Sequence, residues 1–223
     1  MSEKIHSLIV PGDVAVVMID HQPQMLFGVQ SIDRQTLINN SAALAKTAKV
    51  FDIPIVLTTV AAESFSGPLI PQVQNVFPDI APIDRTSMNS WDDENFRRAI
   101  EATGRKRFVI AALWTEVCLV MPVIEMIEAG YEVYIVTDAS GGTSSEAHER
   151  SVARLIQAGA VPVVWLQVLL ELQRDWARTG TYEAVMSLVK DHAGAYGAGV
   201  FYAKSMLGEH ANESGQAVVA NAQ

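Results

Sequence analysis

Five continuous apolar runs of strand length constrain the fold of this chain more than any other feature. Within each run, hydrophobic residues occupy consecutive positions rather than alternate ones. Strands that are apolar on both faces are typical of a parallel sheet covered by helices on both sides. The runs lie at residues 14–20, 54–60, 107–113, 131–138 and 161–166, and a shorter extended piece is expected at 82–85.

Segments with helical periodicity alternate with these runs. We expect helices at about 33–50, 90–102, 120–129, 146–158, 167–178 and 182–192, the second of them capped by Ser90. The pattern predicts an α/β fold of three layers: a doubly wound, Rossmann-like, mostly parallel sheet of about six strands, with helices on both faces. Residues 61–78, punctuated by serine, glycine and proline, are expected to form a long loop or lid.

The regular pattern ends near Ala193, beyond which glycines interrupt the sequence. We therefore expect one domain over residues 8–195 and a C-terminal arm over residues 196–223. Such an arm is ordered only where a neighbouring surface holds it. We expect it to be partly flexible or packed on a neighbouring subunit.

The net charge and the length of the apolar runs disfavour nucleic acids and membranes as binding partners. The chain has 223 residues and a formal net charge of −9, which disfavours a nucleic-acid backbone or an anionic membrane as its partner. No apolar run reaches transmembrane length, and the first residues lack the pattern of a signal peptide. We expect a soluble, cytoplasmic protein that binds neither nucleic acid nor membrane.

Cys118, the only cysteine, lies where the run at 107–113 gives way to a helical segment. Ligands of α/β proteins bind outside the carboxyl ends of the strands. The free N–H groups at a helix N-terminus favour a thiolate, and Pro122 places the start of the regular helix close to Cys118. The alternative is that this cysteine is simply a small buried hydrophobic residue.

Two further polar residues stand at strand ends, Asp20 and Arg85. The C-terminal ends of parallel strands share one edge of the sheet, so both residues can meet Cys118 there. Cys118 can then be a nucleophile, Asp20 its base, and Arg85 a cation that holds the carboxylate and attracts a polar substrate. Each has a plainer explanation when taken singly: a strand-end aspartate commonly caps a turn, and an arginine commonly forms a surface ion pair.

Five short segments then occur in a specific order and spacing. They are VMIDHQ at 17–22, RTSMNSW at 85–91, ALWTEVC at 112–118, GYEVYIVTDA at 130–139 and LQRDW at 172–176. Through them, about residues 10–195 resemble the isochorismatase-like cysteine hydrolases, in particular their YcaC-like branch. The resemblance implies a doubly wound α/β fold and an Asp–Lys/Arg–Cys triad, which corresponds here to Asp20, Arg85 and Cys118.

The resemblance also implies a geometry around the nucleophile. A cis peptide bond is expected between Leu113 and Trp114, and the backbone N–H groups of Trp114 and Cys118 are expected to form an oxyanion hole. Thr115 is expected to hold this turn, with a plain helix cap as the alternative. Arg85 stands where the family commonly has lysine, and an arginine can bind and polarise but cannot shuttle a proton.

The substrate class follows from the nucleophile. True isochorismatases lack a cysteine at this position, so Cys118 disfavours vinyl-ether hydrolysis and favours an amide, nitrile or related acyl substrate. We expect a cysteine hydrolase that cleaves a small-molecule C–N bond through a thioacyl intermediate on Cys118. Gln22, Phe27 and Thr115 are expected to line the substrate pocket.

No metal or cofactor is expected. The five histidines are scattered without ligand spacing, and no glycine-rich dinucleotide motif follows a strand. The resemblance implies a homo-oligomer, specifically an octamer. An alternative function of a different class stays open: an assembly or binding protein on the same fold, with a vestigial catalytic site.

Overall fold

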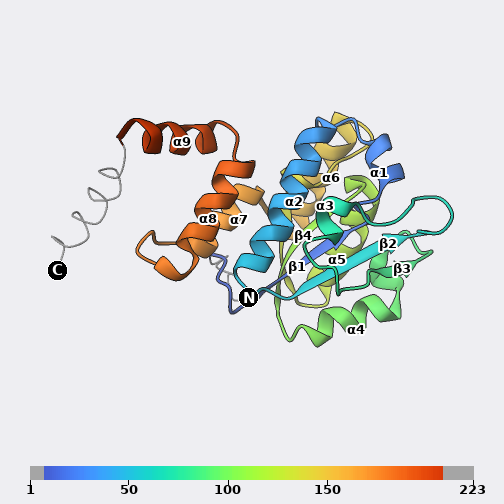
Figure 1. Cartoon of the computed structure of the whole chain (residues 1–223). Coiled ribbons are helices and arrows are strands. Elements are labelled where there is room, and N and C mark those ends of the chain that lie inside the picture. Colours follow the sequence, from blue (N-terminus) through green and yellow to red (C-terminus); the bar gives the residue numbers. More distant parts are fainter. Residues whose placement is uncertain (1–7, 208–223) are drawn as a thin grey trace. The chain divides into compact units, whose positions relative to one another are not determined.

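The computed structural model describes residues 8–207, which fall into two compact units (Figure 1). The first unit ends at Leu172 and the second begins at Gln173. The first contains the sheet and the helices that cover it. The second consists mainly of helices α8 (Thr179–His192) and α9 (Ala195–Leu207).

Six parallel strands form one sheet in the order β3-β2-β1-β4-β5-β6. This order reverses between β1 and β4, as it does in doubly wound sheets. The predicted α/β class and the doubly wound parallel sheet are therefore confirmed. The strands are β1 (Val14–Ile19), β2 (Ile55–Val60), β3 (Ile83–Arg85), β4 (Arg107–Ala112), β5 (Glu132–Val136) and β6 (Val161–Val163).

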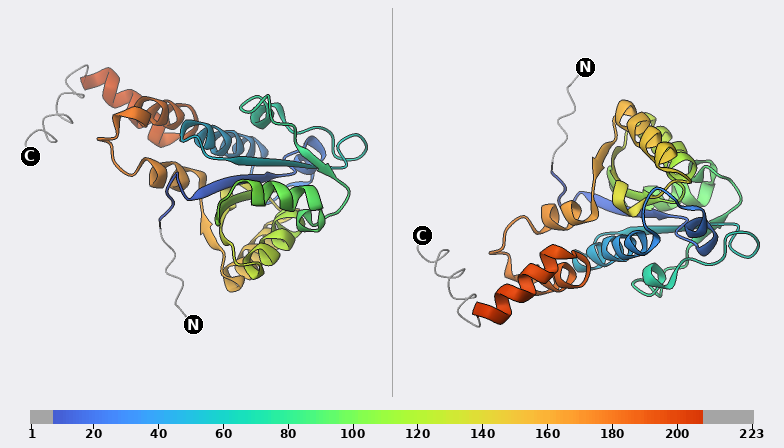
Figure 2. Two further views of the ribbon diagram at one scale, coloured as in Figure 1. Left: turned by 90° about the horizontal axis from the view of Figure 1, so that it is seen from below. Right: turned by 90° about the horizontal axis from the view of Figure 1, so that it is seen from above.

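Helices cover both faces of the sheet. Figure 2 shows α2 (Arg34–Val50) and α3 (Pro71–Gln74) on one face, and α4 (Glu94–Ala102), α5 (Val120–Glu128) and α6 (Ser145–Ala158) on the other. The short helix α1 (Pro23–Gly28) follows β1, and α7 (Trp165–Gln173) follows β6. Three single turns complete the unit: η1 (Ser90–Asp92), the π-helical η2 (Thr115–Leu119) and η3 (Thr137–Ala139).

The two central strands explain why the apolar runs are continuous. Every residue of β1 is buried, and β4 is buried from Phe108 to Ala112. Each residue of β1 pairs with one of β4 in register, from Val14 with Arg107 to Ile19 with Ala112. Burial of such side chains stabilises a fold by about 1.5–3 kcal/mol each. The pairing therefore places the ends of β1 and β4 side by side.

The first helix after β3 begins differently from the expectation. Ser90 was expected to cap it, but α4 begins at Glu94 and its cap is Asp93, whose carboxylate accepts the Phe96 N–H at 2.9 Å. Ser90 instead opens the 3₁₀ turn η1, where the side chain of Asn89 accepts the Trp91 N–H. Asn89 thus caps the 3₁₀ turn η1, and Asp93 caps the helix α4 four residues later. The sequence pattern alone does not show that these are two separate elements.

The C-terminal segment is more regular than the glycine pattern indicates. Helix α9 covers residues 195–207 although Gly197 and Gly199 lie within it. Gly197 is required by close packing, since a Cβ there would lie 2.4 Å from the carbonyl oxygen of Val189 in α8. The helix covers the first part of the expected arm, and residues 208–223 lie outside the described part of the chain.

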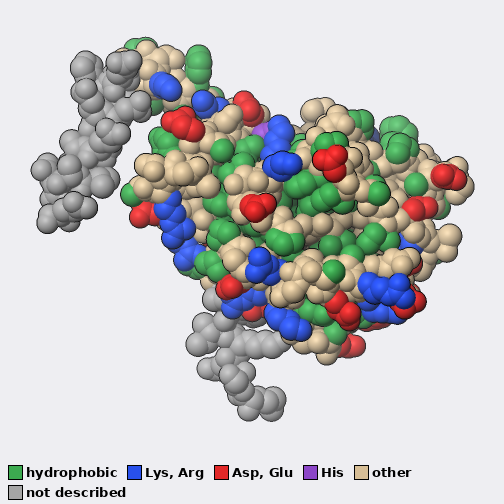
Figure 3. Space-filling model, turned by 60° about the horizontal axis from the view of Figure 1, so that its bottom comes forward, with side chains coloured by type: hydrophobic (Ala, Val, Ile, Leu, Met, Phe, Trp, Pro, Cys, Tyr) green, Lys and Arg blue, Asp and Glu red, His purple; other side chains and the backbone are tan. Residues whose placement is uncertain are grey.

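Charged side chains of both signs are interspersed on the face of the molecule that Figure 3 shows. They alternate there with hydrophobic and neutral side chains. Among residues 8–207, no helix combines the length and the apolar character needed to cross a membrane.

Asp138 links η3 to α7, and its protonation makes the free energy of unfolding depend on pH. Its carboxylate accepts the Trp165 N–H at 2.9 Å, and burial raises the pKa of Asp138 to about 6 from 3.8. Between about pH 4 and 6 the folded protein thus binds more protons at this group than the unfolded chain. The contribution of Asp138 to the free energy of unfolding therefore falls as pH rises through that window.

We expect Asp138→Asn to remove this contribution while keeping the acceptor for the Trp165 N–H. Urea denaturation of wild type and variant at several pH values from 4 to 7 measures it. The wild type should lose stability relative to the variant as pH rises. A difference that stays constant across the range would contradict the assignment.

Candidate active site

Asp20 leaves the end of β1 through a sharp turn. It has φ 60°, in the left-handed region that aspartate tolerates better than most residues. Its own N–H donates to the Thr58 carbonyl oxygen at 3.1 Å, and its carbonyl oxygen accepts the Gln22 N–H at 2.8 Å. The side chain is fully buried. This turn directs a carboxylate into the carboxyl edge of the sheet.

Arg85 forms a buried, two-pronged ion pair with Asp20. Its Nη1 and Nη2 donate to the two carboxylate oxygens, Oδ1 and Oδ2, each at 2.7 Å. Nη1 also donates to the Thr59 carbonyl oxygen at 3.0 Å. Burial lowers the pKa of Arg85, but the hydrogen bond and the charge of Asp20 outweigh it, so the net pKa is raised. The guanidinium is therefore a fixed positive charge in the site.

Cys118 lies in η2, between the end of β4 and the start of α5. It is 3% exposed, so it faces the interior together with Asp20 and Arg85. Its thiol hydrogen-bonds to the Asp20 side chain, and the charge of Arg85 acts on it. The structure thus brings together the three residues that the sequence predicted as a triad. It also places Cys118 in a π-helical turn, a feature often found at functional sites.

The electrostatics of the thiol differ from the expectation. The helix start was expected to favour a thiolate, but the net effect raises the pKa of Cys118. Burial is the largest cause and the negative charge of Asp20 the second; Arg85 and the backbone N–H of Trp114 lower the pKa by less. The charge of Asp20 acts on the thiol more strongly than that of Arg85, so Arg85 does not offset burial. Cys118 is therefore a neutral thiol at rest.

The turn that carries the nucleophile has the expected cis bond between Leu113 and Trp114. The Trp114 N–H, one expected oxyanion-hole donor, acts on the sulfur of Cys118. The Cys118 N–H, the second expected donor, donates to the Trp114 carbonyl oxygen at 2.9 Å. The oxyanion hole therefore stays a prediction.

The three predicted pocket residues have different surroundings. Gln22 is buried, and its amide spans the loop after β2: it donates to the carbonyl oxygens of Val60 and Gly67 and accepts the Val60 N–H. Phe27, in α1, is 68% exposed. Thr115 is fully buried, and its hydroxyl contacts Nδ1 of His148 at 2.8 Å. Gln22 and Thr115 thus hold backbone segments around the triad, and a pocket role for all three stays a prediction.

Two residues near the triad were missed in the sequence. Thr58 Oγ1 donates to Asp20 Oδ1 at 3.0 Å, and His148 contacts Thr115 from α6. Thr58 could have been noticed as a polar residue inside an otherwise apolar strand. His148 carried no such signal, because it lies on a helix far along the chain.

The described residues contain no group of three or more histidine, cysteine, aspartate or glutamate side chains arranged to hold a metal ion. The three candidate residues supply one thiol, one carboxylate and one guanidinium. Such a set can perform nucleophilic attack with proton transfer to the carboxylate.

The opposing effects on Cys118 predict the behaviour of two variants. Asp20→Asn removes the negative charge that raises the pKa of the thiol and leaves Arg85 to lower it. We expect iodoacetamide to alkylate this variant about tenfold faster than wild type near neutral pH, because only the thiolate reacts. Arg85→Gln should have the opposite effect and slow alkylation. The rate of mass gain at several pH values measures both.

Asp84→Asn is a matched control for these variants. Asp84 neighbours Arg85 in β3, but its carboxylate accepts from Thr59 Oγ1 and the Ala62 N–H. Its loss should leave the alkylation rate unchanged. Slower alkylation of Asp20→Asn would mean that Asp20 promotes ionisation of the resting thiol, against the electrostatics described above.

Comparison with known proteins places this site in a family. The isochorismatase domain model matches residues 14–167. The protein named "Probable hydrolase YcaC", from Escherichia coli (strain K12), is 40% identical over 186 residues, which are 83% of this chain and 88% of that protein.

Solved structures agree with this match. YcaC from Pseudomonas aeruginosa, described with hexane-2,5-diol and covalent acrylamide, superposes with a TM-score of 0.86 at 34% identity, covering 90% of this chain and 98% of that one. Escherichia coli YcaC, described as an octameric hydrolase of unknown specificity, gives a TM-score of 0.86 at 36% identity, covering 92% and 99%. This chain belongs to the isochorismatase-like hydrolase family.

Proposed function

We propose that this protein is a metal-independent cysteine hydrolase that cleaves the C–N bond of a small amide or nitrile. The observation that carries the proposal is that the Cys118 thiol, Asp20 and Arg85 interact within one buried site. Membership of a hydrolase family supports the reaction class. The substrate type and the residue roles are our inference from the chemistry of the site.

The first half of the reaction forms a thioester from an amide. As the sulfur bonds to the carbonyl carbon, the thiol proton passes to Asp20, so no free thiolate accumulates. Oδ2 of Asp20 suits this transfer better than Oδ1, which already accepts from both Thr58 and Arg85. The Trp114 N–H stabilises the developing oxyanion. Collapse of the intermediate breaks the C–N bond, and the amine leaves with the proton held by Asp20.

The second half releases the acid. Asp20 takes a proton from water as the water oxygen attacks the thioester carbon, and the departing sulfur recovers a proton. Arg85 stays protonated throughout and keeps the Asp20 carboxylate in position.

One observation favours the alternative of a vestigial site on a binding or assembly protein. Asp20, Arg85 and Cys118 are 0%, 4% and 3% exposed, so a substrate reaches them only after the covering groups move. A vestigial site predicts that no amide or nitrile forms an adduct with Cys118. The hydrolase predicts a thioacyl adduct with its substrate.

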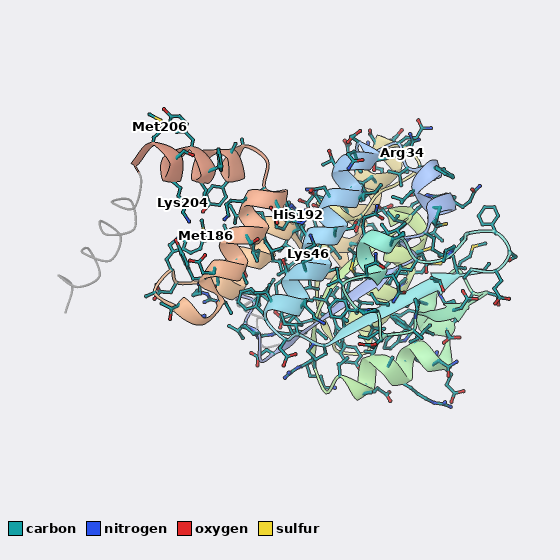
Figure 4. The ribbon with its side chains drawn as sticks, viewed as in Figure 1. Arg34, Lys46, Met186, His192, Lys204 and Met206 are labelled. Carbon is teal, nitrogen blue, oxygen red and sulfur yellow. The ribbon has the colours of Figure 1, made fainter. Side chains whose placement is uncertain are left out.

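We also propose that the protein is a homo-oligomer, and that residues 196–223 act as an arm in its assembly. The Escherichia coli relative is described as octameric. In the second unit, Phe201, Tyr202 and Met206 of α9 are each more than 60% exposed. Figure 4 shows Met206 and Lys204 projecting from different sides of this helix. A monomer in light scattering would contradict the assembly.

Removal of the nucleophile tests the hydrolase proposal. A panel of small amides and nitriles is screened for ammonia or amine release, and each reaction is analysed by intact-mass spectrometry for an acyl adduct. Loss of a catalytic nucleophile costs on the order of 10⁴-fold or more in kcat. We expect Cys118→Ala to lose both turnover and adduct. Full turnover by Cys118→Ala would rule out the mechanism.

Acrylamide is left out of the panel, because its C=C bond can alkylate a thiol without any C–N cleavage; a YcaC structure is described with covalent acrylamide. Asp84→Asn serves again as the control variant and should keep full turnover, because its carboxylate bonds to Thr59 and Ala62 rather than to the triad.

A further inference from the structure

The segment at 141–148 forms several hydrogen bonds with residues 113–116, at the start of the turn η2 that carries Cys118. The Thr115 N–H donates to the Gly141 carbonyl oxygen at 3.0 Å, and Leu113 and Gly141 form a parallel bridge. Glu116 Oε1 accepts both the N–H and the hydroxyl of Thr143, at 2.9 and 2.5 Å. The turn after the cis bond is thus bound to the start of α6 at several points.

His148, in α6, contacts the fully buried side chain of Thr115 at the start of η2. Its Nδ1 lies 2.8 Å from Oγ1 of Thr115, whose side chain is fully buried. Burial lowers the pKa of His148, and the charges of Glu116 and Glu149 offset this only in part. The imidazole is therefore neutral at neutral pH and acts on the turn through its hydrogen bond rather than through a charge.

We propose that His148 is a positioning residue for the Cys118 nucleophile: by fixing the Thr115 hydroxyl, it holds the turn that carries the sulfur. The inference rests on the proposed function, which needs the sulfur to stay beside Asp20. Thr115 is the first residue of η2, so a rotation of the Thr115 backbone moves the rest of the turn and Cys118 with it. The hydrogen bond to α6 and the bond to Gly141 restrict that rotation from two sides.

The pKa of the Cys118 thiol depends on how this turn is held. The Trp114 N–H lowers the pKa of the Cys118 thiol, in opposition to burial and Asp20. Loss of the hold by His148 lets the turn shift and the sulfur move away from the Trp114 N–H, so the thiol becomes harder to ionise. The pH profile of Cys118 alkylation should therefore shift upward when the His148–Thr115 bond is removed. A residue that only stabilised α6 would not produce this shift.

Iodoacetamide alkylation of the full chain from pH 6 to 10 measures the effect without a substrate. We expect His148→Leu to slow alkylation at a fixed pH about fivefold, the effect of one ordinary hydrogen bond. His148→Asn, which keeps a polar atom near the position of Nδ1, should restore the rate to within about twofold. Thr115→Val removes the same bond from the other side and should match His148→Leu. The double variant should be no slower than either, since both remove one interaction.

Ser151→Ala is the control on the same helix. It removes a hydrogen bond within α6, from Ser151 Oγ to the Ala147 carbonyl oxygen. It should leave the alkylation profile unchanged even if it lowers the melting temperature. The proposal is overturned if His148→Leu and Thr115→Val alkylate like wild type, or if Ser151→Ala shifts the profile as much as they do. Failure of the proposed function shows separately, as the absence of any acyl adduct in the amide and nitrile panel.

Discussion

The buried ion pair between Asp20 and Arg85 is the interaction on which the candidate site depends. The two residues leave β1 and β3, which are not neighbours in the sheet, and the pair spans the end of β2 between them. Thr58 and Thr59 of β2 complete the bonding, through a hydroxyl and a carbonyl oxygen. Buried charges are costly unless they are paired and hydrogen-bonded, and here both conditions hold. Three strand ends are thereby fixed around one carboxylate.

That carboxylate then determines the state of the nucleophile. Burial and the charge of Asp20 act on the Cys118 thiol more strongly than the charge of Arg85 does. An arginine beside a cysteine is commonly taken to favour a thiolate. In the mechanism that we propose, the arginine holds the base, and proton transfer accompanies bond formation instead of preceding it.

Much of this architecture could be predicted from the sequence, for definite reasons. Continuous apolar runs identify strands that are buried on both faces, and the shared edge of a parallel sheet brings Asp20, Arg85 and Cys118 together. The register of β1 with β4 pairs Ile19 with Ala112, so Asp20 leaves the sheet beside the chain that leads to Cys118. Helix ends were less predictable, since Ser90 and Asp93 lie close together and either can cap a turn.

The sign of the shift in the thiol pKa could not be predicted from the sequence. It depends on how deeply the sulfur is buried and on whether the charge of Asp20 or that of Arg85 acts on it more strongly. His148 was missed for a related reason, because its contact with Thr115 joins two helical segments 33 residues apart.

The protonated state of Cys118 also affects how readily the side chain is oxidised. Peroxides oxidise thiolates far faster than thiols, and exposed, acidic cysteines are the ones lost to sulfenic and sulfinic acids. A thiol that is kept buried and neutral, as Cys118 is, resists that damage.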